Sequence, residues 1–172
     1  MVAKILITGH FSAGKTQLIN TLSGNILSTE VKISLEEEKK KETTTVAMDY
    51  GKIKTSGFDV HLFGTPGQER FDFMLDILGK EHDGAIVVVD STDILNVKKS
   101  VRFIDFLRKN GKPFIVACNK QDKDNCMNPA EISLLLNLPE DIVFPLIAYD
   151  KHSCLYVIDK IISHISSNKK AA

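Results

Sequence analysis

The sequence has no excess of charge of either sign: its 172 residues include 22 Lys and Arg and 22 Asp and Glu, which gives a formal net charge of zero. Nucleic acids and anionic membranes attract proteins through concentrated positive charge. The balance therefore predicts neither as a partner held by bulk electrostatics. The proportions of hydrophobic (43%) and charged residues (26%) are usual for a folded globular domain and argue against disorder or a coiled coil.

Long nonpolar runs are also absent. The runs that occur are short, as at residues 85–89, whereas a membrane-spanning helix needs about 18 or more such residues. The first residues turn polar at Lys4, too early for a signal peptide. Position 2 is Val2 rather than glycine and no cysteine lies near the C-terminus, so neither myristoylation nor prenylation is encoded. We expect a cytoplasmic protein with no direct membrane anchor.

Cysteine is scarce and does not form a metal-binding pattern. Cys118, Cys126 and Cys154 lack the spacing of metal ligands, and an odd number of cysteines fits a reducing compartment. At about 150 residues per domain, the length predicts a single domain over residues 1–172.

Short nonpolar runs rich in Val and Ile alternate with stretches of helical periodicity along almost the whole chain. Continuous runs of this kind are typical of parallel strands covered on both faces. Nonpolar residues recur every three or four positions over residues 94–107 and 155–165, and Asn128, Pro129 and Glu131 are typical of a helix start. We therefore predict an α/β domain with a mostly parallel sheet. The expected strands are residues 4–8, 58–63, 85–90, 113–119 and 142–148.

One stretch breaks this alternation. Residues 45–54 and 58–63 are predicted to be two strands joined by a tight turn at Ser56 and Gly57, which makes the first of them an antiparallel edge strand. The charged run at residues 36–42 comes just before it. We interpret this run as a solvated, mobile segment, or alternatively as a short helix with ion pairs four residues apart.

The residues from Gly9 to Thr16 read Gly-His-Phe-Ser-Ala-Gly-Lys-Thr, and they lie between the first strand and a helical stretch. This is the phosphate-binding loop pattern in the context that it requires. The glycines let the backbone wrap closely around phosphate, and successive N–H groups with the helix N-terminus form an anion-binding nest. Lys15 is expected to reach the outer phosphates and the Thr16 hydroxyl to bind Mg²⁺. The pattern predicts nucleotide binding.

A second motif, Asn119-Lys120-Gln121-Asp122, directly follows the strand at 113–118. Ligands of α/β sheets bind at this carboxyl edge. A carboxylate at Asp122 can accept hydrogen bonds from the ring N–H and the amine of guanine, and adenine lacks that pair of donors. The stem of Lys120 can cover the purine plane, and Asn119 can brace the loop. The motif predicts selectivity for guanine.

Taken in order, these motifs resemble those of the Ras-like small GTPases over essentially the whole chain. The resemblance implies a P-loop NTPase fold with a six-stranded, mostly parallel sheet, one antiparallel edge strand and about five flanking helices. It implies GTP or GDP with Mg²⁺ as ligands.

In that family, one threonine of switch I closes over Mg²⁺ and the γ-phosphate. Thr43, Thr44 and Thr45 are the candidates, and the residues after Thr45 resemble the Rab pattern, so we choose Thr45 as the second metal ligand beside Thr16. The alternative is a threonine-rich edge strand with no contact to the metal.

Switch II departs from the majority pattern. The resemblance assigns the Gly67 amide to the γ-phosphate and Gln68 to orienting the attacking water. Most relatives have, at the position of Gly64, an aspartate that supports Mg²⁺ through water. Some prokaryotic members, including the gliding-motility polarity switch, lack it before Pro-Gly-Gln, and the chain resembles these most. Asp90 either compensates for the missing carboxylate or caps the loop that follows it.

Other site residues follow from the resemblance alone. The Ala148 amide aligns with the one that contacts the guanine oxygen, and Phe11 replaces a frequent glycine, where it would obstruct an incoming arginine or pack on switch II. None of the three arginines precedes Arg70, so no internal arginine is expected to speed hydrolysis. The expected nucleotide contacts are Gly9, Phe11, Ser12, Ala13, Gly14, Lys15, Thr16, Gln17, Asn119, Lys120, Asp122 and Ala148.

The leading hypothesis is a GTP-hydrolysing switch, slow by itself and stimulated by an activating or exchange partner, that engages a protein effector in one nucleotide state. The alternative is a nucleotide-bound scaffold with little or no hydrolysis. An ATP-dependent kinase is disfavoured because no lid or acceptor site is evident in the sequence. The sequence leaves the oligomeric state open.

Overall fold

A computed structural model describes residues 1–24, 27–37, 40–66, 75 and 81–171. Its central feature is a seven-stranded sheet with the order β2-β3-β4-β1-β5-β6-β7. Within this sheet, β3 pairs antiparallel with both of its neighbours, and every other pairing is parallel. The strands are β1 Val2–Thr8, β2 Leu27–Glu37, β3 Lys40–Thr55, β4 Phe58–Gly64, β5 Gly84–Asp90, β6 Phe114–Asn119 and β7 Val143–Pro145.

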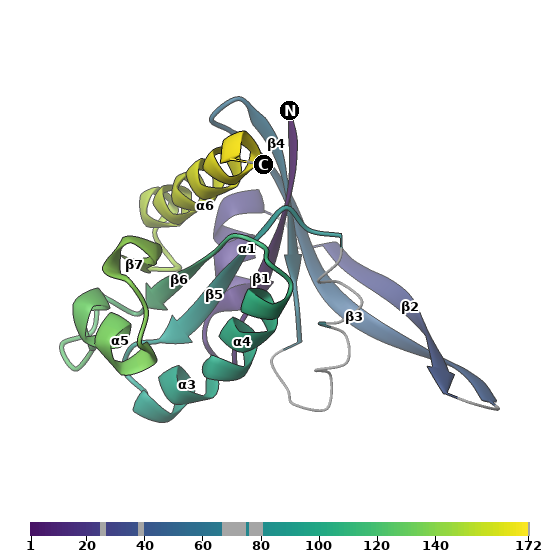
Figure 1. The fold of residues 1–172 in the computed structure, drawn as a ribbon, viewed down its shortest axis with the longest axis horizontal. Helices are drawn as coiled ribbons and strands as arrows, with labels where there is room; N and C mark the ends of the chain where they lie inside the picture. The colour runs from purple at the N-terminus through teal and green to yellow at the C-terminus, as the bar shows by residue number, and fades with distance from the viewer. Residues whose placement is uncertain (25–26, 38–39, 67–74, 76–80, 172) are drawn as a thin grey trace.

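Helices cover the sheet on both faces (Figure 1). Alternate residues of a strand point to opposite faces, so Ile5 and Ile7 of β1 join a core under α1 and α6, while Leu6 joins a second core under α3, α4 and α5. The predicted α/β architecture is therefore confirmed. The α-helices of the described residues are α1 Lys15–Ser23, α3 Ile94–Lys99, α4 Val101–Lys109, α5 Pro129–Leu136 and α6 Lys151–Ala171, and Glu140–Ile142 forms a 3-10 turn.

The sheet departs from the prediction at both ends. The strand β2 lies outside β3, so the antiparallel strand is present as predicted but is not the edge, and the described sheet has one strand more than six. At the other end β7 is only Val143–Pro145 instead of 142–148. The N–H of Leu146 still donates to the Cys118 carbonyl of β6 (2.9 Å), but the Leu146 carbonyl accepts from the Gln121 N–H (3.3 Å) in the loop after β6, where the strand pairing ends.

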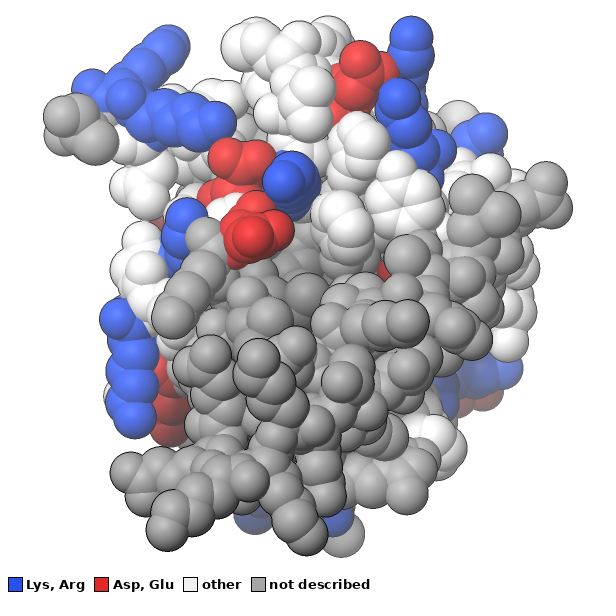
Figure 2. All heavy atoms as spheres, turned by 90° about the vertical axis from the view of Figure 1, so that its right-hand side faces the viewer, with Lys and Arg blue, Asp and Glu red and all other residues white. Residues whose placement is uncertain are grey.

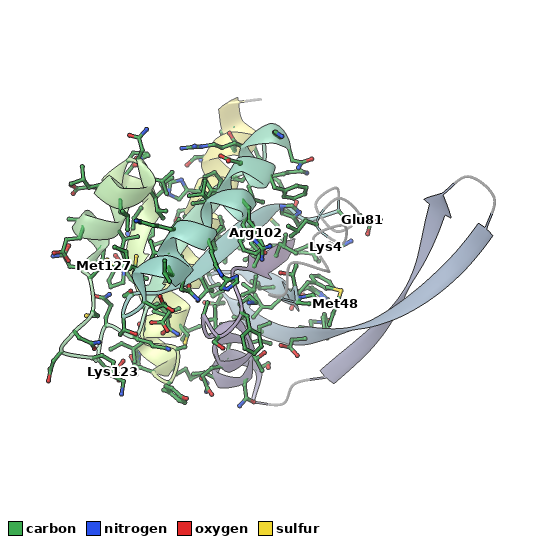
Figure 3. All side chains as sticks on the ribbon, turned by 90° about the horizontal axis from the view of Figure 1, so that it is seen from below. Lys4, Met48, Glu81, Arg102, Lys123 and Met127 are labelled. Carbon is green, nitrogen blue, oxygen red and sulfur yellow. The ribbon has the colours of Figure 1, made fainter. Side chains whose placement is uncertain are left out.

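The strands β2 and β3 form a long hairpin that extends away from the body (Figures 1 and 3). The described residues of the charged run, 36–37 and 40–42, lie at its end, where Glu37 is opposite Lys40 and Glu36 is opposite Lys41. Facing opposite charges favour antiparallel pairing. Residues 36–37 and 40–42 are therefore strand residues and do not form the short helix of the alternative interpretation, while residues 38 and 39 are outside the described residues.

The turn between β3 and β4 was correctly located by the sequence. Ser56 and Gly57 have φ of 50° and 78°, the left-handed values that a two-residue hairpin turn requires. Because this turn is two residues long, it sets the whole register between the strands, including the pair Asp49 and Gly64.

The surface charges of the described residues are mixed in sign. On the face shown in Figure 2, lysine and arginine side chains lie beside aspartate and glutamate side chains. Elsewhere in the described chain, opposite charges also pair, as where Nζ of Lys169 lies 3.3 Å from Oδ1 of Asp83. None of the helices described is long and nonpolar enough to cross a membrane.

Candidate functional site

The loop between β1 and α1 lies at the carboxyl edge of the sheet. Gly9 has φ of 142°, and a Cβ there would lie 2.2 Å from the Val88 carbonyl oxygen. Gly14 has φ of 108°, and a Cβ there would lie 2.2 Å from Nδ2 of Asn119. Only glycine therefore lets this loop fit against β5 and β6. Gly14 precedes α1 and leaves the first N–H groups of that helix without a side-chain cap, as at an anion site.

Lys15 lies across this loop. Its ammonium group donates to the carbonyls of Gly9 (2.7 Å) and His10 (2.9 Å), and the residue is 8% exposed. Burial lowers the pKa of Lys15 to about 8, against the opposing effect of the Asp49 carboxylate, and the Arg102 guanidinium lowers it further. An incoming phosphate would stabilise the charged form and reverse this shift.

Asn119 connects the phosphate loop to the loop after β7. Its Nδ2 donates to the Ala13 carbonyl (2.9 Å), and its Oδ1 accepts from the Ala148 N–H (3.0 Å). The Ala148 carbonyl accepts from the Thr21 hydroxyl of α1 (2.6 Å), and that hydroxyl accepts from Nε2 of Gln17 (3.0 Å). Three segments far apart in the sequence are thus joined around buried polar contacts.

The other residues of the second motif lie at the same edge. Lys120 has φ of 69° and forms an ion pair with Asp90. Asp122 is exposed, and its Oδ2 lies 3.6 Å from Nζ of Lys123. Lys120 and Asp122, the two side chains predicted to contact the base, therefore follow Asn119 directly at this edge of the sheet.

Asp90 caps the loop that follows β5 and holds Lys120. Its Oδ1 accepts from the N–H (2.9 Å) and hydroxyl (2.7 Å) of Thr92, and its Oδ2 accepts from Lys120. Burial alone would raise the pKa of Asp90, but these hydrogen bonds outweigh it and lower the pKa. Both oxygens are occupied, so the capping alternative describes this residue.

Asp49 is a site residue that the sequence interpretation missed. The Thr16 hydroxyl donates to Oδ2 of Asp49 (2.5 Å). Asp49 lies on β3 directly opposite Gly64 of β4. A Cβ at Gly64 would lie 3.1 Å from the Asp49 Cβ and 2.8 Å from Cδ1 of Ile19. The Asp49 carboxylate of the neighbouring strand therefore lies beside Thr16, close to the space that the glycine at position 64 leaves.

The predicted switch residues are not gathered at this site. Thr45 lies in β3 opposite Lys32, four residues before Asp49, which at ~3.3 Å per strand residue is about 13 Å along the strand. Thr43 and Thr44 lie farther out. Thr65 continues β4, with its N–H donating to the Ile7 carbonyl (2.9 Å). Gly67 and Gln68 are outside the described residues.

Comparison with known proteins decides the family. The family model of the elongation factor Tu GTP-binding domain matches residues 1–163 of the chain. The chain belongs to this family. This GTP-binding domain is 31% identical over 161 residues to an uncharacterized protein of Methanocaldococcus jannaschii, and the match covers 94% of this chain and 96% of that protein.

Two further comparisons agree with this assignment. The GTP-binding domain is 30% identical over 141 residues to ADP-ribosylation factor-like protein 4C of Homo sapiens, covering 79% of this chain and 69% of that protein. The crystal structure of the G domain of the T. maritima FeoB iron transporter has a TM-score of 0.67 at 19% identity, covering 95% of this chain and 99% of that one. The P-loop GTPase fold predicted from the motifs is confirmed.

In a GTP-binding domain, the pair formed by Thr16 and Asp49 fits Mg²⁺. This ion is usually bound by one or two protein oxygens together with nucleotide phosphates and waters. A hydroxyl and a carboxylate that already touch, beside the ammonium group of Lys15, provide such oxygens. The register between β3 and β4 was the available signal, because the predicted turn at 56–57 places Asp49 opposite Gly64.

Phe11 projects from the phosphate loop with 59% of its surface exposed. Its carbonyl accepts from Nδ2 of Asn96 (3.1 Å), whose Oδ1 accepts from the Asp90 N–H (2.9 Å). The helix α3 therefore fixes the loop backbone while the ring stays accessible. The two remaining loop residues are Ser12, with φ of 64°, and Ala13, which is buried.

Proposed function

We propose that this GTP-binding domain is a molecular switch that binds GTP with Mg²⁺, hydrolyses it slowly to GDP, and engages a protein effector in one nucleotide state. The observation that carries the proposal is the pair of hydrogen bonds of Asn119, which donates to the phosphate loop at Ala13 and accepts from the N–H of Ala148. A nucleotide bound along this edge would have its phosphates and its base recognised by parts of one rigid frame.

The described side chains suggest how the nucleotide would be held. Lys15 would release the two loop carbonyls and meet the outer phosphates, while Thr16 and Asp49 would hold Mg²⁺, which neutralises the phosphates. Asp122 would accept from guanine, with Lys120 kept in place by Asp90. The Ala148 N–H donates to Asn119 in the structure, and a contact from the same N–H to guanine stays a prediction from the family resemblance.

The position of Thr45 suggests how the two nucleotide states would differ. About 13 Å of strand separates it from Asp49, so it cannot reach a metal at Thr16 while the β2–β3 hairpin is formed. We infer that closure of switch I over GTP requires the outer hairpin to rearrange. Such a rearrangement would present different surfaces in the two nucleotide states, which is what an effector needs to distinguish them.

Isothermal titration of the whole chain with GDP, a non-hydrolysable GTP analogue and ATP tests the binding proposal. We expect tight binding of both guanine nucleotides and at least a hundredfold weaker binding of ATP, as about 10⁴-fold discrimination is common where a site hydrogen-bonds its ligand. Asp122→Asn should shift the preference toward xanthine nucleotides. Equal affinity for ATP would overturn the assignment of guanine.

Single-turnover hydrolysis separates the switch from a nucleotide-bound scaffold. We expect an intrinsic rate of about 10⁻⁴ to 10⁻³ per second, as for related domains without an internal arginine, whereas a domain with an arginine in cis reaches about 10⁻² per second. Gln68→Leu should lower it further without weakening GTP binding. A rate that does not change with this substitution would favour the scaffold.

A further inference from the structure

The strand β2 is a long edge of the sheet. It runs for eleven residues, Leu27–Glu37, and within the described sheet it pairs with β3 only. Figures 1 and 3 show that the hairpin projects away from the helices, and Met48, labelled in Figure 3 and 2% exposed, lies where it leaves the body. An edge strand offers a row of backbone N–H and C=O groups to another strand. The outer side of β2 is such a row.

The sequence of β2 alternates strictly. Its odd-numbered positions from 27 to 35 are Leu, Thr, Val, Ile and Leu, and its even-numbered positions from 28 to 36 are Ser, Glu, Lys, Ser and Glu. Alternate positions of a strand lie on opposite faces, so the strand has one nonpolar and one polar face. Natural edge strands are commonly kept from pairing by proline, bulges, short length or charged side chains, and of these devices β2 has the charged residues at 30, 32, 36 and 37. The strand β2 contains no proline and keeps an unbroken register with β3.

The same sequence is complementary to itself when two copies run antiparallel about Val31. In that register, Glu30 of one copy faces Lys32 of the other, and this happens twice. Leu27 faces Leu35, also twice, and Val31 faces its own counterpart. Moving the two-fold centre by one residue would put Glu30 opposite Glu30 or Lys32 opposite Lys32, and like charges in facing positions are destabilising. The charges therefore select one register.

We propose that β2 pairs antiparallel with β2 of a second copy of this chain, in the register centred on Val31, so that the two sheets become one continuous sheet. Facing residues share a face of the sheet, so the pairing joins the nonpolar faces of both strands on one side. The isologous, two-fold arrangement is the commonest form of homodimer. The zero net charge of the chain adds no overall repulsion between copies. This interface does not rest on the proposed function.

Charge reversal at the two facing positions tests the proposal directly. Wild-type chain should self-associate in sedimentation equilibrium, with a mass that rises from 19.1 kDa toward twice that value as concentration increases. Glu30→Lys alone and Lys32→Glu alone should each weaken self-association about tenfold, because each creates two like-charge pairs in the homodimer. An equimolar mixture of the two variants should recover it, since every facing pair then has opposite charges.

The chain also provides controls for this test. Within one copy, Glu30 lies opposite Ala47 and Lys32 opposite Thr45, so neither substitution breaks a facing charge pair of the hairpin itself. Lys52→Glu, at an exposed position of β3 opposite His61 of β4, changes the net charge equally outside the proposed interface and should leave self-association unchanged.

Three results would overturn the proposal: wild-type chain that stays monomeric at all concentrations, single variants that associate as well as wild type, or a mixture that fails to associate better than either variant alone. Should a single variant fold poorly, the double variant Glu30→Lys with Lys32→Glu restores both opposite pairs. It should self-associate as wild type does, and its failure to do so while folded would also overturn the proposal.

Discussion

At the scale of single residues, the position of one carboxylate determines how the metal would be held. Asp49 and Gly64 face each other across β3 and β4, and the space beside Thr16 is filled by the Asp49 side chain. A Cβ at position 64 would lie 2.8 Å from Cδ1 of Ile19 and 3.1 Å from Cβ of Asp49, which is closer than side chains normally pack. The two residues therefore depend on each other. Gly64 leaves the room that the Asp49 side chain occupies, and Asp49 provides a carboxylate that a glycine at position 64 cannot.

We predict that Asp49→Asn weakens Mg²⁺ binding in the nucleotide complex by about 10- to 100-fold, the usual cost of losing a residue that supports a metal. The release of a fluorescent GDP analogue, measured over a series of Mg²⁺ concentrations, should accelerate at concentrations where the wild-type complex is stable. Asp59→Asn, on β4 and paired with Lys54, is the matched control. An Mg²⁺ dependence identical to that of wild type would contradict a role for Asp49.

The lowered pKa of Lys15 predicts a pH dependence of nucleotide binding. In the free domain, burial lowers the pKa of Lys15 to about 8, and a bound phosphate should raise it again. Binding therefore takes up a proton when the pH is above about 8, and affinity should fall as the pH rises from there toward the ordinary lysine value of about 10.4.

Titration in two buffers of different ionisation enthalpy should detect this proton uptake near pH 9. The same linkage makes the free domain more stable as the pH rises over this range, because the unfolded chain binds the proton that folded Lys15 has lost. Nucleotide binding without proton uptake at this pH would show that the ammonium group does not change its environment when phosphate arrives.

At the scale of elements, the site depends on how separate loops are held together. Asn119 connects the loop before α1 with the loop after β7, and the Thr21 hydroxyl connects α1 with the same loop. No single loop forms this frame by itself, so its geometry depends on the parallel order of β1, β5, β6 and β7.

Asn119→Ala leaves the Ala13 carbonyl and the Ala148 N–H without their partner in a buried setting. We predict a loss of about 1–3 kcal/mol in the free energy of unfolding for each unpaired group, together with much faster GDP release. Urea unfolding and nucleotide-release rates measure the two effects. Asn110→Ala, which removes a hydrogen bond at the exposed end of α4, should change stability only slightly and release not at all.

The sequence predicted the elements whose patterns are local. The turn at 56–57, the phosphate loop and the nonpolar strands other than the shortened β7 are where they were expected. The strand β2 was missed because its partner is the segment after the charged run, and facing positions such as Glu36 and Lys41 become visible only when the two segments are paired. Asp49 was missed for a similar reason, since its proximity to Thr16 arises from strand register and not from spacing along the chain.

At the scale of the whole molecule, the site loops belong to a compact body and the candidate switch threonines belong to a projecting hairpin. The two cores on either side of the sheet hold the phosphate and base loops in place. The hairpin contains Thr43, Thr44 and Thr45. These threonines lie farther out along β3 than Asp49, the β3 residue that contacts Thr16. If the domain is a switch as we propose, a change of nucleotide would alter the hairpin while the body stays as it is.

This division predicts where the two nucleotide states differ. If Thr45 closes over the metal when GTP is bound, the pairing of β2 with β3 must open around Thr45 and Lys32, and their backbone amides lose protection from hydrogen exchange. Hydrogen exchange followed by mass spectrometry should show faster exchange in peptides from residues 27–47 with a GTP analogue than with GDP. Peptides from β5 and β6, which are buried between the two cores, should exchange equally in both states and serve as the internal control. Equal protection of the hairpin in both states would mean that Thr45 never reaches the metal, and the threonines would then be strand residues only.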